Sequence, residues 1–178
     1  QMLHLEHARV VGDGEALLPL EYSGLKVMSI GFLLPNADDP VVWRGPMKMT
    51  VIRQFLEDVA WGDLDCLVVD LPPGTGDIQL SVCQLAAPVD GAVIVTTPQR
   101  ISTADVRRSI RFCQKTDVPV LGVVENMSGF VCPKCGETTH VFKTGGGETM
   151  SAEMGVPFFG RVPLDPRIGL ASDDGIPF

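Results

Sequence analysis

Residues 64–77 read Leu-Asp-Cys-Leu-Val-Val-Asp-Leu-Pro-Pro-Gly-Thr-Gly-Asp, and this stretch decides the expected fold class. The run from Cys66 to Val69 is apolar without polar alternation, and a Pro-Pro-Gly turn follows it closely. This pattern is typical of a strand that is buried on both faces, as in parallel sheets covered by helices. Ligands of such sheets bind beyond the carboxyl ends of the strands, so Asp70 is expected at a ligand site.

The role of Asp70 has two interpretations. As a Walker-B-type acid, it would hold Mg²⁺, directly or through water, against the phosphates of a nucleotide. The turn from Pro72 to Gly76 could then bring backbone N–H groups to the terminal phosphate. As an ordinary turn residue, Asp70 would only hydrogen-bond its own turn. The local pattern alone leaves both interpretations open.

The composition limits the class of protein. With 178 residues, 45% of them hydrophobic, the chain is long enough for one domain with a substantial core. Its formal net charge of -8 argues against nucleic acid or an anionic membrane surface as the main partner. No stretch approaches the length of a membrane span, and the first residues lack the form of a signal peptide. We therefore expect a cytoplasmic protein.

The rest of the sequence alternates between strand and helix patterns. Strands are expected at residues 25–31, 91–97, 118–125 and 158–163, and helices at 46–60, 78–85, 102–113 and 148–154. Ser102 is expected to cap the helix that begins there. This alternation predicts an α/β fold, doubly wound, with a mostly parallel sheet flanked by helices.

The five cysteines fall into two groups. Cys66, Cys83 and Cys113 lie in apolar segments and are expected to pack as small buried hydrophobes. Cys132 and Cys135, in Cys-Pro-Lys-Cys-Gly, have metal-ligand spacing, and a reducing compartment favours a metal over a structural disulfide. Because His140 follows five residues later, a zinc site within one chain is also conceivable.

Five motifs resemble, in order, the Mrp-type P-loop ATPases, which are iron-sulfur cluster carriers and scaffolds related to MinD and the nitrogenase iron protein. They are Asp70-Leu-Pro-Pro-Gly-Thr-Gly-Asp77, Val95-Thr-Thr-Pro-Gln99, Val124-Glu-Asn-Met-Ser128, Cys132-Pro-Lys-Cys135 and Gly160-Arg-Val-Pro-Leu-Asp165, and Trp43-Arg-Gly-Pro46 adds to them. The resemblance covers about Leu25 to Ala171. It implies a MinD-like fold, binding of ATP and Mg²⁺, and slow ATP hydrolysis.

The resemblance also implies partners and site residues. A [4Fe-4S] cluster would be carried between the subunits of a homodimer, or of a heterodimer with a paralogue, and passed to recipient iron-sulfur apoproteins. Cys132 and Cys135 would supply two of its four thiolates and a second copy the others, with zinc as a substitute metal. Asp70 would be catalytic. The implied nucleotide-binding residues are Asp70, Pro73, Gly74, Thr75, Gly76, Asn126, Pro163 and Asp165.

Two of these assignments have alternatives. The amide of Asn126 would pair with the N6/N7 edge of adenine, but an Asn after a strand can also simply occupy a left-handed turn. For the whole chain, the alternative functions are a MinD-like partner-binding ATPase with a structural zinc at the Cys-x-x-Cys loop, and a nucleotide-free scaffold.

The sequence departs from the family in one respect. No Gly-x-x-x-x-Gly-Lys-Ser/Thr motif occurs in it, and the glycine-rich stretch Lys143–Glu148 has the wrong order for a phosphate-binding loop. The aspartates of the first switch should also precede Gln1. We therefore expect residues 1–178 to form one P-loop-type ATPase domain that is incomplete at its N-terminus and possibly at its C-terminus.

Overall fold

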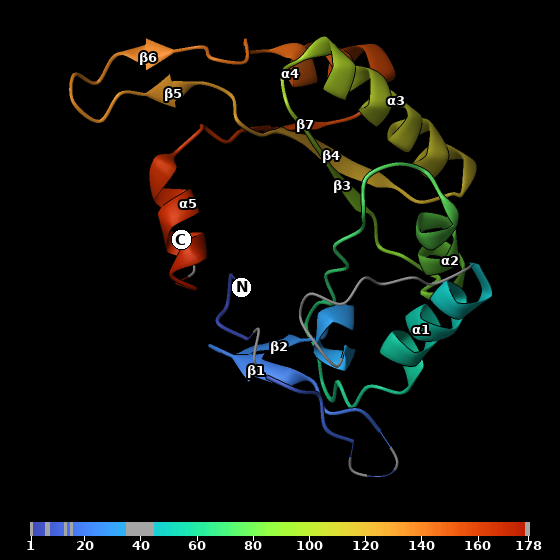
Figure 1. The fold of residues 1–178 in the computed structure, drawn as a ribbon. Helices are drawn as coiled ribbons and strands as arrows, with labels where there is room; N and C mark the ends of the chain where they lie inside the picture. The colour runs from blue at the N-terminus through green and yellow to red at the C-terminus, as the bar shows by residue number, and fades with distance from the viewer. Residues whose placement is uncertain (1, 6–7, 13, 15, 35–44, 177–178) are drawn as a thin grey trace. The chain divides into compact units, whose positions relative to one another are not determined.

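A computed structural model describes residues 2–5, 8–12, 14, 16–34 and 45–176 (Figure 1). The loop expected at 35–40, together with Trp43 and Arg44 of the family motif, lies outside these described residues. The chain divides into two compact units. The first consists of Gln1–Leu71 with Arg167–Phe178, and the second of Pro72–Pro166.

The first unit contains a short hairpin and a helix. Strand β1 (Leu20–Tyr22) pairs antiparallel with β2 (Leu25–Val27) across a turn at residues 23 and 24, both of which have positive φ. A 3-10 helix, η1 (Ile30–Leu33), follows, so the strand predicted over 25–31 is shorter than expected. Helix α1 (Gly45–Glu57) confirms the helix predicted from residue 46, where proline suits the first turn.

Residues 62–70 form neither helix nor strand, so the prediction of a buried strand at Cys66–Val69 is wrong for this structure. Val68 is 84% exposed, and Cys66 is exposed as well. A strand must pair its backbone N–H and C=O groups with a neighbouring strand. Within the described part of the chain, no strand pairs with this run. Its apolar sequence therefore stays in irregular backbone.

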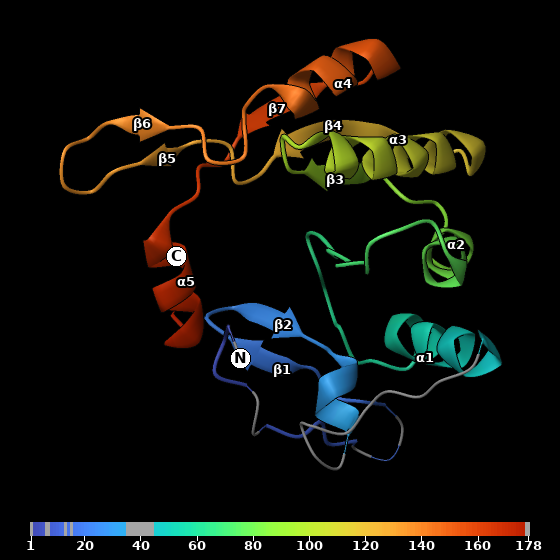
Figure 2. The ribbon, with the colours of Figure 1, turned by 45° about the horizontal axis from the view of Figure 1, so that its top comes forward.

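The second unit is built on a parallel sheet in the order β3-β4-β7. Its strands are β3 (Ala92–Thr96), β4 (Val120–Glu125) and β7 (Phe158–Arg161). Helix α3 (Arg100–Lys115) connects β3 to β4, and helix α4 (Gly146–Met154) precedes β7. Helix α2 (Asp77–Leu85) comes before the sheet. The predicted α/β class, with parallel strands alternating with helices, is confirmed (Figures 1 and 2).

The core of the second unit lies between this sheet and the two helices α3 and α4. Ile110 of α3, Val123 of β4 and Met150 of α4 are at most 1% exposed and form its centre. Val93 and Val95, which point to the opposite face of β3, are 52% and 57% exposed. This strand is therefore buried on one face only, because α3 and α4 pack on the same face.

A second hairpin leaves the sheet between β4 and α4. It consists of β5 (Phe130–Val131) and β6 (Thr138–Thr139), which pair antiparallel around the Cys-x-x-Cys segment. We call residues 130–139 the cysteine hairpin. Both ribbon views show it projecting away from the three-stranded sheet (Figures 1 and 2). Sequence periodicity did not predict it, because each strand has only two residues.

Candidate nucleotide and cluster site

The carboxyl ends of the parallel strands form one edge, and backbone hydrogen bonds continue beyond it. The N–H of Asn126 donates to the carbonyl of Thr96 at 2.7 Å, and the N–H of Val162 donates to that of Glu125 at 2.9 Å. Ser102, which was expected to cap α3, instead accepts a hydrogen bond from Thr97 N at 3.1 Å. The residue that caps α3 is Gln99, and its side chain accepts no hydrogen bond from the first N–H groups of the helix.

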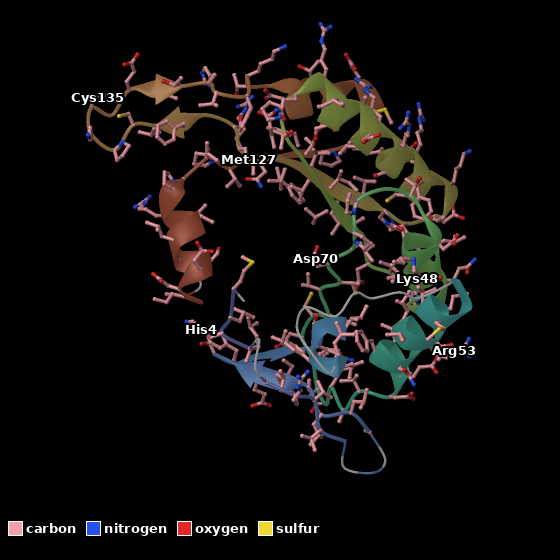
Figure 3. The ribbon with its side chains drawn as sticks, viewed as in Figure 1. His4, Lys48, Arg53, Asp70, Met127 and Cys135 are labelled. Atoms are coloured by element: carbon pink, nitrogen blue, oxygen red, sulfur yellow. The ribbon has the colours of Figure 1, made fainter. Side chains whose placement is uncertain are left out.

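Asn126 directly follows β4, and the oxygen of its side-chain amide is hydrogen-bonded. Its Oδ1 accepts a hydrogen bond from the N–H of Met127 at 2.9 Å. Among the described residues, none accepts a hydrogen bond from its Nδ2. The left-handed residue of this turn is Met127, with φ 52°, and Figure 3 shows it near the end of β4. The turn therefore needs Asn126 as an acceptor only and leaves its donor available.

Pro163 lies in a segment that runs beside the one containing Asn126. The N–H of Ser128 donates to the carbonyl of Val162 at 2.9 Å, and the N–H of Leu164 donates to that of Gly129 at 2.7 Å. Together with the bond from the N–H of Val162 to the carbonyl of Glu125, they hold the two segments together on both sides of Asn126. Asp165 follows two residues after Pro163, so these three predicted nucleotide residues come from adjacent backbone.

The turn at residues 72–76 is placed beside α3. Gly74 has φ 106°, which favours glycine, and Gln79 Nε2 donates to the carbonyl of Pro72 at 2.6 Å. Gly76 is the N-cap of α2 and leaves that helix without a side-chain cap. Thr75 lines a basic groove with residues of α3, namely Arg107, Arg108, Arg111, Phe112 and Lys115. Among the described residues, no hydrogen bond joins this turn to Asn126 or Pro163.

Asp70 belongs to the first unit, whereas the other predicted site residues belong to the second. It is exposed and stands in the irregular segment 62–70 (Figure 3). Its role as a magnesium ligand stays a prediction.

The cysteine hairpin is closed by a tight turn that brings both thiols to its tip. The N–H of Cys132 donates to the carbonyl of Glu137 at 2.9 Å, and the N–H of Gly136 donates to the carbonyl of Cys132 at 2.8 Å. Gly136 has φ 72°, a conformation that favours glycine. Cys135 is exposed at the tip (Figure 3), and both cysteines are free thiols.

The turn stabilises the thiolate of Cys132. Backbone N–H groups of Cys135 and Lys134, and then the Cys135 thiol, donate hydrogen bonds to its sulfur and hold its pKa below the ordinary value. The thiolate is the form that ligates metal ions and clusters. The donors present thus suit a metal or the edge of a cluster.

Among the described residues, Cys132 and Cys135 have no third metal ligand beside them. Within the part of the chain that the structure describes, no group of three His, Cys, Asp or Glu side chains could hold a metal ion. A Cβ placed on Gly129 would lie 3.7 Å from Nδ1 of His140, so this ring lies over the base of the hairpin. The described residues therefore do not form the zinc site that was considered for Cys132, Cys135 and His140.

Glu125 was not predicted as a site residue, yet it is the most fully enclosed acid of this edge, with 0% exposure. It accepts hydrogen bonds from Gly147 N at 2.5 Å, Gly145 N at 2.9 Å and the Ser128 hydroxyl. Arg161 Nε lies 3.4 Å from Oε1. Burial raises the pKa of Glu125, but these hydrogen bonds and Arg161 together hold it below its ordinary value.

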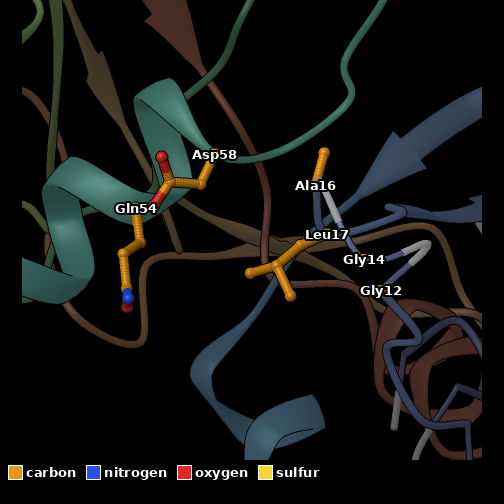
Figure 4. A pocket seen from close by; sticks show the side chains of 6 residues that line it. All are labelled: Gly12, Gly14, Ala16, Leu17, Gln54 and Asp58. Carbon is orange, nitrogen blue, oxygen red and sulfur yellow. The ribbon is translucent and has the colours of Figure 1, made fainter.

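The first unit has a separate hollow, lined by Gly12, Gly14, Ala16, Leu17, Gln54 and Asp58 (Figure 4). The N–H of Leu17 donates to the carbonyl of Asp58 at 2.8 Å and closes one side of it. Asp58 is the single ionisable side chain among these described lining residues. A lone carboxylate does not make a metal site or an acid-base pair. In the described residues, no helix combines the length and apolarity needed to cross a membrane.

Comparison with known proteins identifies the relatives of this chain. A ParA family model described as NUBPL iron-transfer P-loop NTPase matches residues 1–178. The iron-sulfur cluster carrier protein of Methanocaldococcus jannaschii is 48% identical over 99% of this chain. The cytosolic Fe-S cluster assembly factor NUBP2 homolog of Nematostella vectensis is 50% identical over 100% of it. The chain spans 61% and 68% of the lengths of these two relatives.

Solved structures agree with the fold. A nucleotide-binding protein of Archaeoglobus fulgidus in complex with ADP is 41% identical, with a TM-score of 0.82 over 98% of this chain and 67% of its own. The cell division ATPase MinD of Pyrococcus furiosus has a TM-score of 0.51 over 75% of this chain and 49% of its own, at 22% identity. The second similarity concerns the fold alone.

Proposed function

Because the chain belongs to the NUBPL iron-transfer P-loop NTPase family, we propose that it is part of an ATP-dependent carrier of iron-sulfur clusters. The carrier would bind a [4Fe-4S] cluster as cargo between two subunits and transfer it to recipient apoproteins. The observation that carries this proposal is the cysteine hairpin, in which hydrogen bonds from the turn lower the pKa of the Cys132 thiol and the exposed thiol of Cys135 lies beside it.

The number of thiols supports a site between two chains. A [4Fe-4S] cluster is usually held by four cysteine thiolates. One hairpin offers two, and the described residues provide no third ligand beside them. A two-fold axis that brings two hairpins together would complete the set with the same residues of a second copy. A paralogue with an equivalent hairpin would serve equally well.

Asn126 supports nucleotide binding at the carboxyl edge of the sheet. Its Nδ2 is available as a donor, which suits the N7 of an adenine, and Pro163 and Asp165 lie on the adjacent segment. The Archaeoglobus relative is named as an ADP complex. Bound ATP would supply the phosphoryl group that is hydrolysed.

The phosphates of the nucleotide would bind at a different segment from its adenine. The turn from Pro73 to Gly76, with the uncapped start of α2, is proposed for their binding, and Asp70 for Mg²⁺. In this assignment the N–H groups at the start of α2 bind the terminal phosphate, and Asp70 is the metal-ligating acid.

The nucleotide and the cargo would be coupled through a short piece of chain. The cysteine hairpin begins four residues after Asn126, and Leu164 pairs with its first residue, Phe130. A movement that closes two subunits around ATP would therefore shift the two hairpins as well. Binding and release of the cluster would then depend on which nucleotide is bound.

Cysteine substitutions test this function. In the full-length protein, we expect Cys132→Ser and Cys135→Ser each to abolish cluster binding and leave nucleotide affinity unchanged. Iron and acid-labile sulfide are measured after anaerobic reconstitution, and nucleotide affinity by titration. Cys66→Ser is the matched control, because Cys66 is also an exposed free thiol but lies outside the hairpin. A complete cluster in either hairpin variant would refute the proposal.

A second candidate is a MinD-like partner-binding ATPase with zinc at the hairpin. The turn favours it in one respect, since stabilised thiolates in tetrahedral sites accept zinc as well as iron. The same metal analysis decides between the two. About four iron and four sulfide per two chains would indicate the carrier, whereas zinc without sulfide after reconstitution would indicate the second candidate.

A further inference from the structure

Glu125 is a buried charged group that neither the nucleotide nor the cluster chemistry uses. It ends β4, next to Asn126, and its side chain has 0% exposure. A buried carboxylate is tolerated only when it is well paired and hydrogen-bonded. Three donors and one guanidinium meet these requirements for Glu125. The partners of the carboxylate show what it connects.

Those partners lie on both sides of the cysteine hairpin. Ser128 precedes the hairpin, and Gly145 and Gly147 follow it, so one carboxylate joins the chain where it leaves the sheet to the chain where it returns. Ser128 Oγ also lies 3.1 Å from Thr144 Oγ1, which adds a direct bond across the same place. We call residues 128 and 144–147 the neck of the hairpin.

The glycine-rich stretch of the neck acts as an anion site for this internal carboxylate. Gly145 is left-handed with φ 81°, and α4 begins directly after it, where the first N–H groups of a helix have no partner within the helix. Gly147 allows close approach, since a Cβ there would lie 2.9 Å from Thr96 Cγ2 and 3.1 Å from Glu125 Oε2. The donors that could bind a phosphate in such a stretch are thus used by Glu125.

Arg161 extends the connection to the third strand. Its Nε faces Glu125, and its Nη2 pairs with Glu148 in the first turn of α4. Val162, the next residue, donates its N–H to the carbonyl of Glu125. The carboxylate therefore joins the ends of two strands, the start of α4 and the neck of the hairpin.

From this arrangement we propose that Glu125 is the positioning residue that fixes the cysteine hairpin to the nucleotide edge of the sheet. The role assigned to Glu125 rests on the proposed function, whereas its hydrogen bonds do not depend on that function. A shift of Asn126 on nucleotide exchange would be passed by the adjacent Glu125 to both ends of the neck. Without the carboxylate, the hairpin would remain able to bind metal but would not respond to the nucleotide.

The first experiment measures the neck itself. In the full-length protein, Glu125→Gln replaces one acceptor oxygen with an NH₂ group that cannot accept from the neck N–H groups. We expect amide hydrogen exchange at Gly145 and Gly147 to become at least about tenfold faster. Glu148→Gln is the matched control, because Glu148 lies in the first turn of α4, next to Gly147, but is exposed. Unchanged exchange in Glu125→Gln would overturn the inference.

The second experiment measures the coupling. Rates of iodoacetamide alkylation at Cys132 and Cys135 are compared with Mg-ATP, with Mg-ADP and without nucleotide. We expect a nucleotide-dependent change of several-fold in the unmodified protein and in Glu148→Gln, and no change in Glu125→Gln. Nucleotide titration checks that Glu125→Gln still binds ATP, so that a lost response reflects lost coupling. A response retained by Glu125→Gln would overturn the inference.

The two proposals can fail separately. If the unmodified protein shows no nucleotide response while Glu125→Gln loosens the neck, the gating in the proposed function is refuted and the positioning role stands. Should Glu125→Gln not fold, Ser128→Ala removes the two bonds that the Ser128 hydroxyl makes in the neck, to Glu125 and to Thr144, and keeps the carboxylate. It should reduce the nucleotide response by about half or more, and a full response would count against the inference.

Discussion

Glu125 and Cys132 are acidic side chains whose charged forms the fold stabilises in the same way. In each, backbone N–H groups donate to the atom that carries the charge and keep the pKa below its ordinary value. The surroundings differ, because Glu125 is enclosed whereas Cys132 lies on a projecting hairpin. The enclosed charge therefore serves structure, and the accessible one is available to a ligand.

The ionisation of Glu125 predicts a pH dependence of the neck. A folded-state pKa below the ordinary 4.5 means that ionisation contributes stability above the unfolded pKa, and that this is lost as pH falls through the folded pKa. Hydrogen exchange at Gly145 and Gly147, corrected for intrinsic pH dependence, should thus be constant above about pH 5 and accelerate as pH falls through the folded-state pKa, below 4.5. Arg161 faces Glu125 through Nε and Glu148 through Nη2. Glu125→Gln should lack this acid transition.

Asn126 allows a test that separates adenine recognition from turn formation. We expect Asn126→Ala to weaken nucleotide binding by about 10-fold to 100-fold, since a bidentate amide pair contributes about 1–3 kcal/mol of discrimination. Asn126→Asp keeps an acceptor for the N–H of Met127 but removes the amide donor. Titration with ATP should show weakened nucleotide binding in both variants. Recovery of affinity in Asn126→Asp would mean that the residue only shapes the turn.

At the scale of elements, the start of α4 lies very close to neighbouring backbone at Gly146. Gly146 packs directly on backbone, since a Cβ there would lie 2.3 Å from the carbonyl oxygen of Pro98. Gly155 ends the same helix in a left-handed conformation with φ 65°. The position of α4 against the end of β3 is therefore set by the absence of side chains as much as by packing.

Gly146→Ala should destabilise the protein although alanine is the better helix former. Overpacking against backbone costs about 1–3 kcal/mol, which outweighs the gain of up to about 1 kcal/mol in helix propensity. Gly169→Ala in α5 (Pro166–Asp173) is the matched control, because a Cβ there meets nothing within 4 Å. Denaturant unfolding should show a loss for the first and no loss for the second. Equal stability of the two variants would contradict the close approach.

At the scale of the molecule, stability of the second unit depends on a small core between α3, α4 and the sheet. Ile110 and Val123 are both 0% exposed, and Phe158 and Val106 are partly buried around them. Strand β4 connects this core to the edge of the sheet. Its residue Val123 lies in the core, and its last residue, Glu125, lies at the edge next to Asn126. Loss of core packing should therefore affect the whole unit.

One helix provides a matched pair for this prediction. Ile110→Ala should cost about 2–5 kcal/mol in the free energy of unfolding, because it leaves a cavity in a packed core. Ile101→Ala, also on α3, should change it by no more than about 0.5 kcal/mol, since Ile101 is 80% exposed. Both values come from denaturant unfolding followed by circular dichroism. A small effect at Ile110 would mean that the core is not where the structure places it.

Sequence by itself determined the elements whose signal is local. The helices α3 and α4 and the strands β3, β4 and β7 follow from periodicity in single stretches, and the spacing of Cys132 and Cys135 from a motif of four residues. Family membership follows in the same way from ordered motifs. In each case the information lies within one segment of chain.

Only the tertiary structure decided what depends on distant partners. The run Cys66–Val69 has the sequence of a buried strand but lacks a pairing neighbour among the described residues, and pairing is a property of two segments. Two of the three hydrogen bonds to Glu125 come from residues 20 and 22 positions away, so no local pattern marks it as a buried acid. A charge becomes tolerable in a protein interior only when donors converge on it from elsewhere, and that convergence is created by folding.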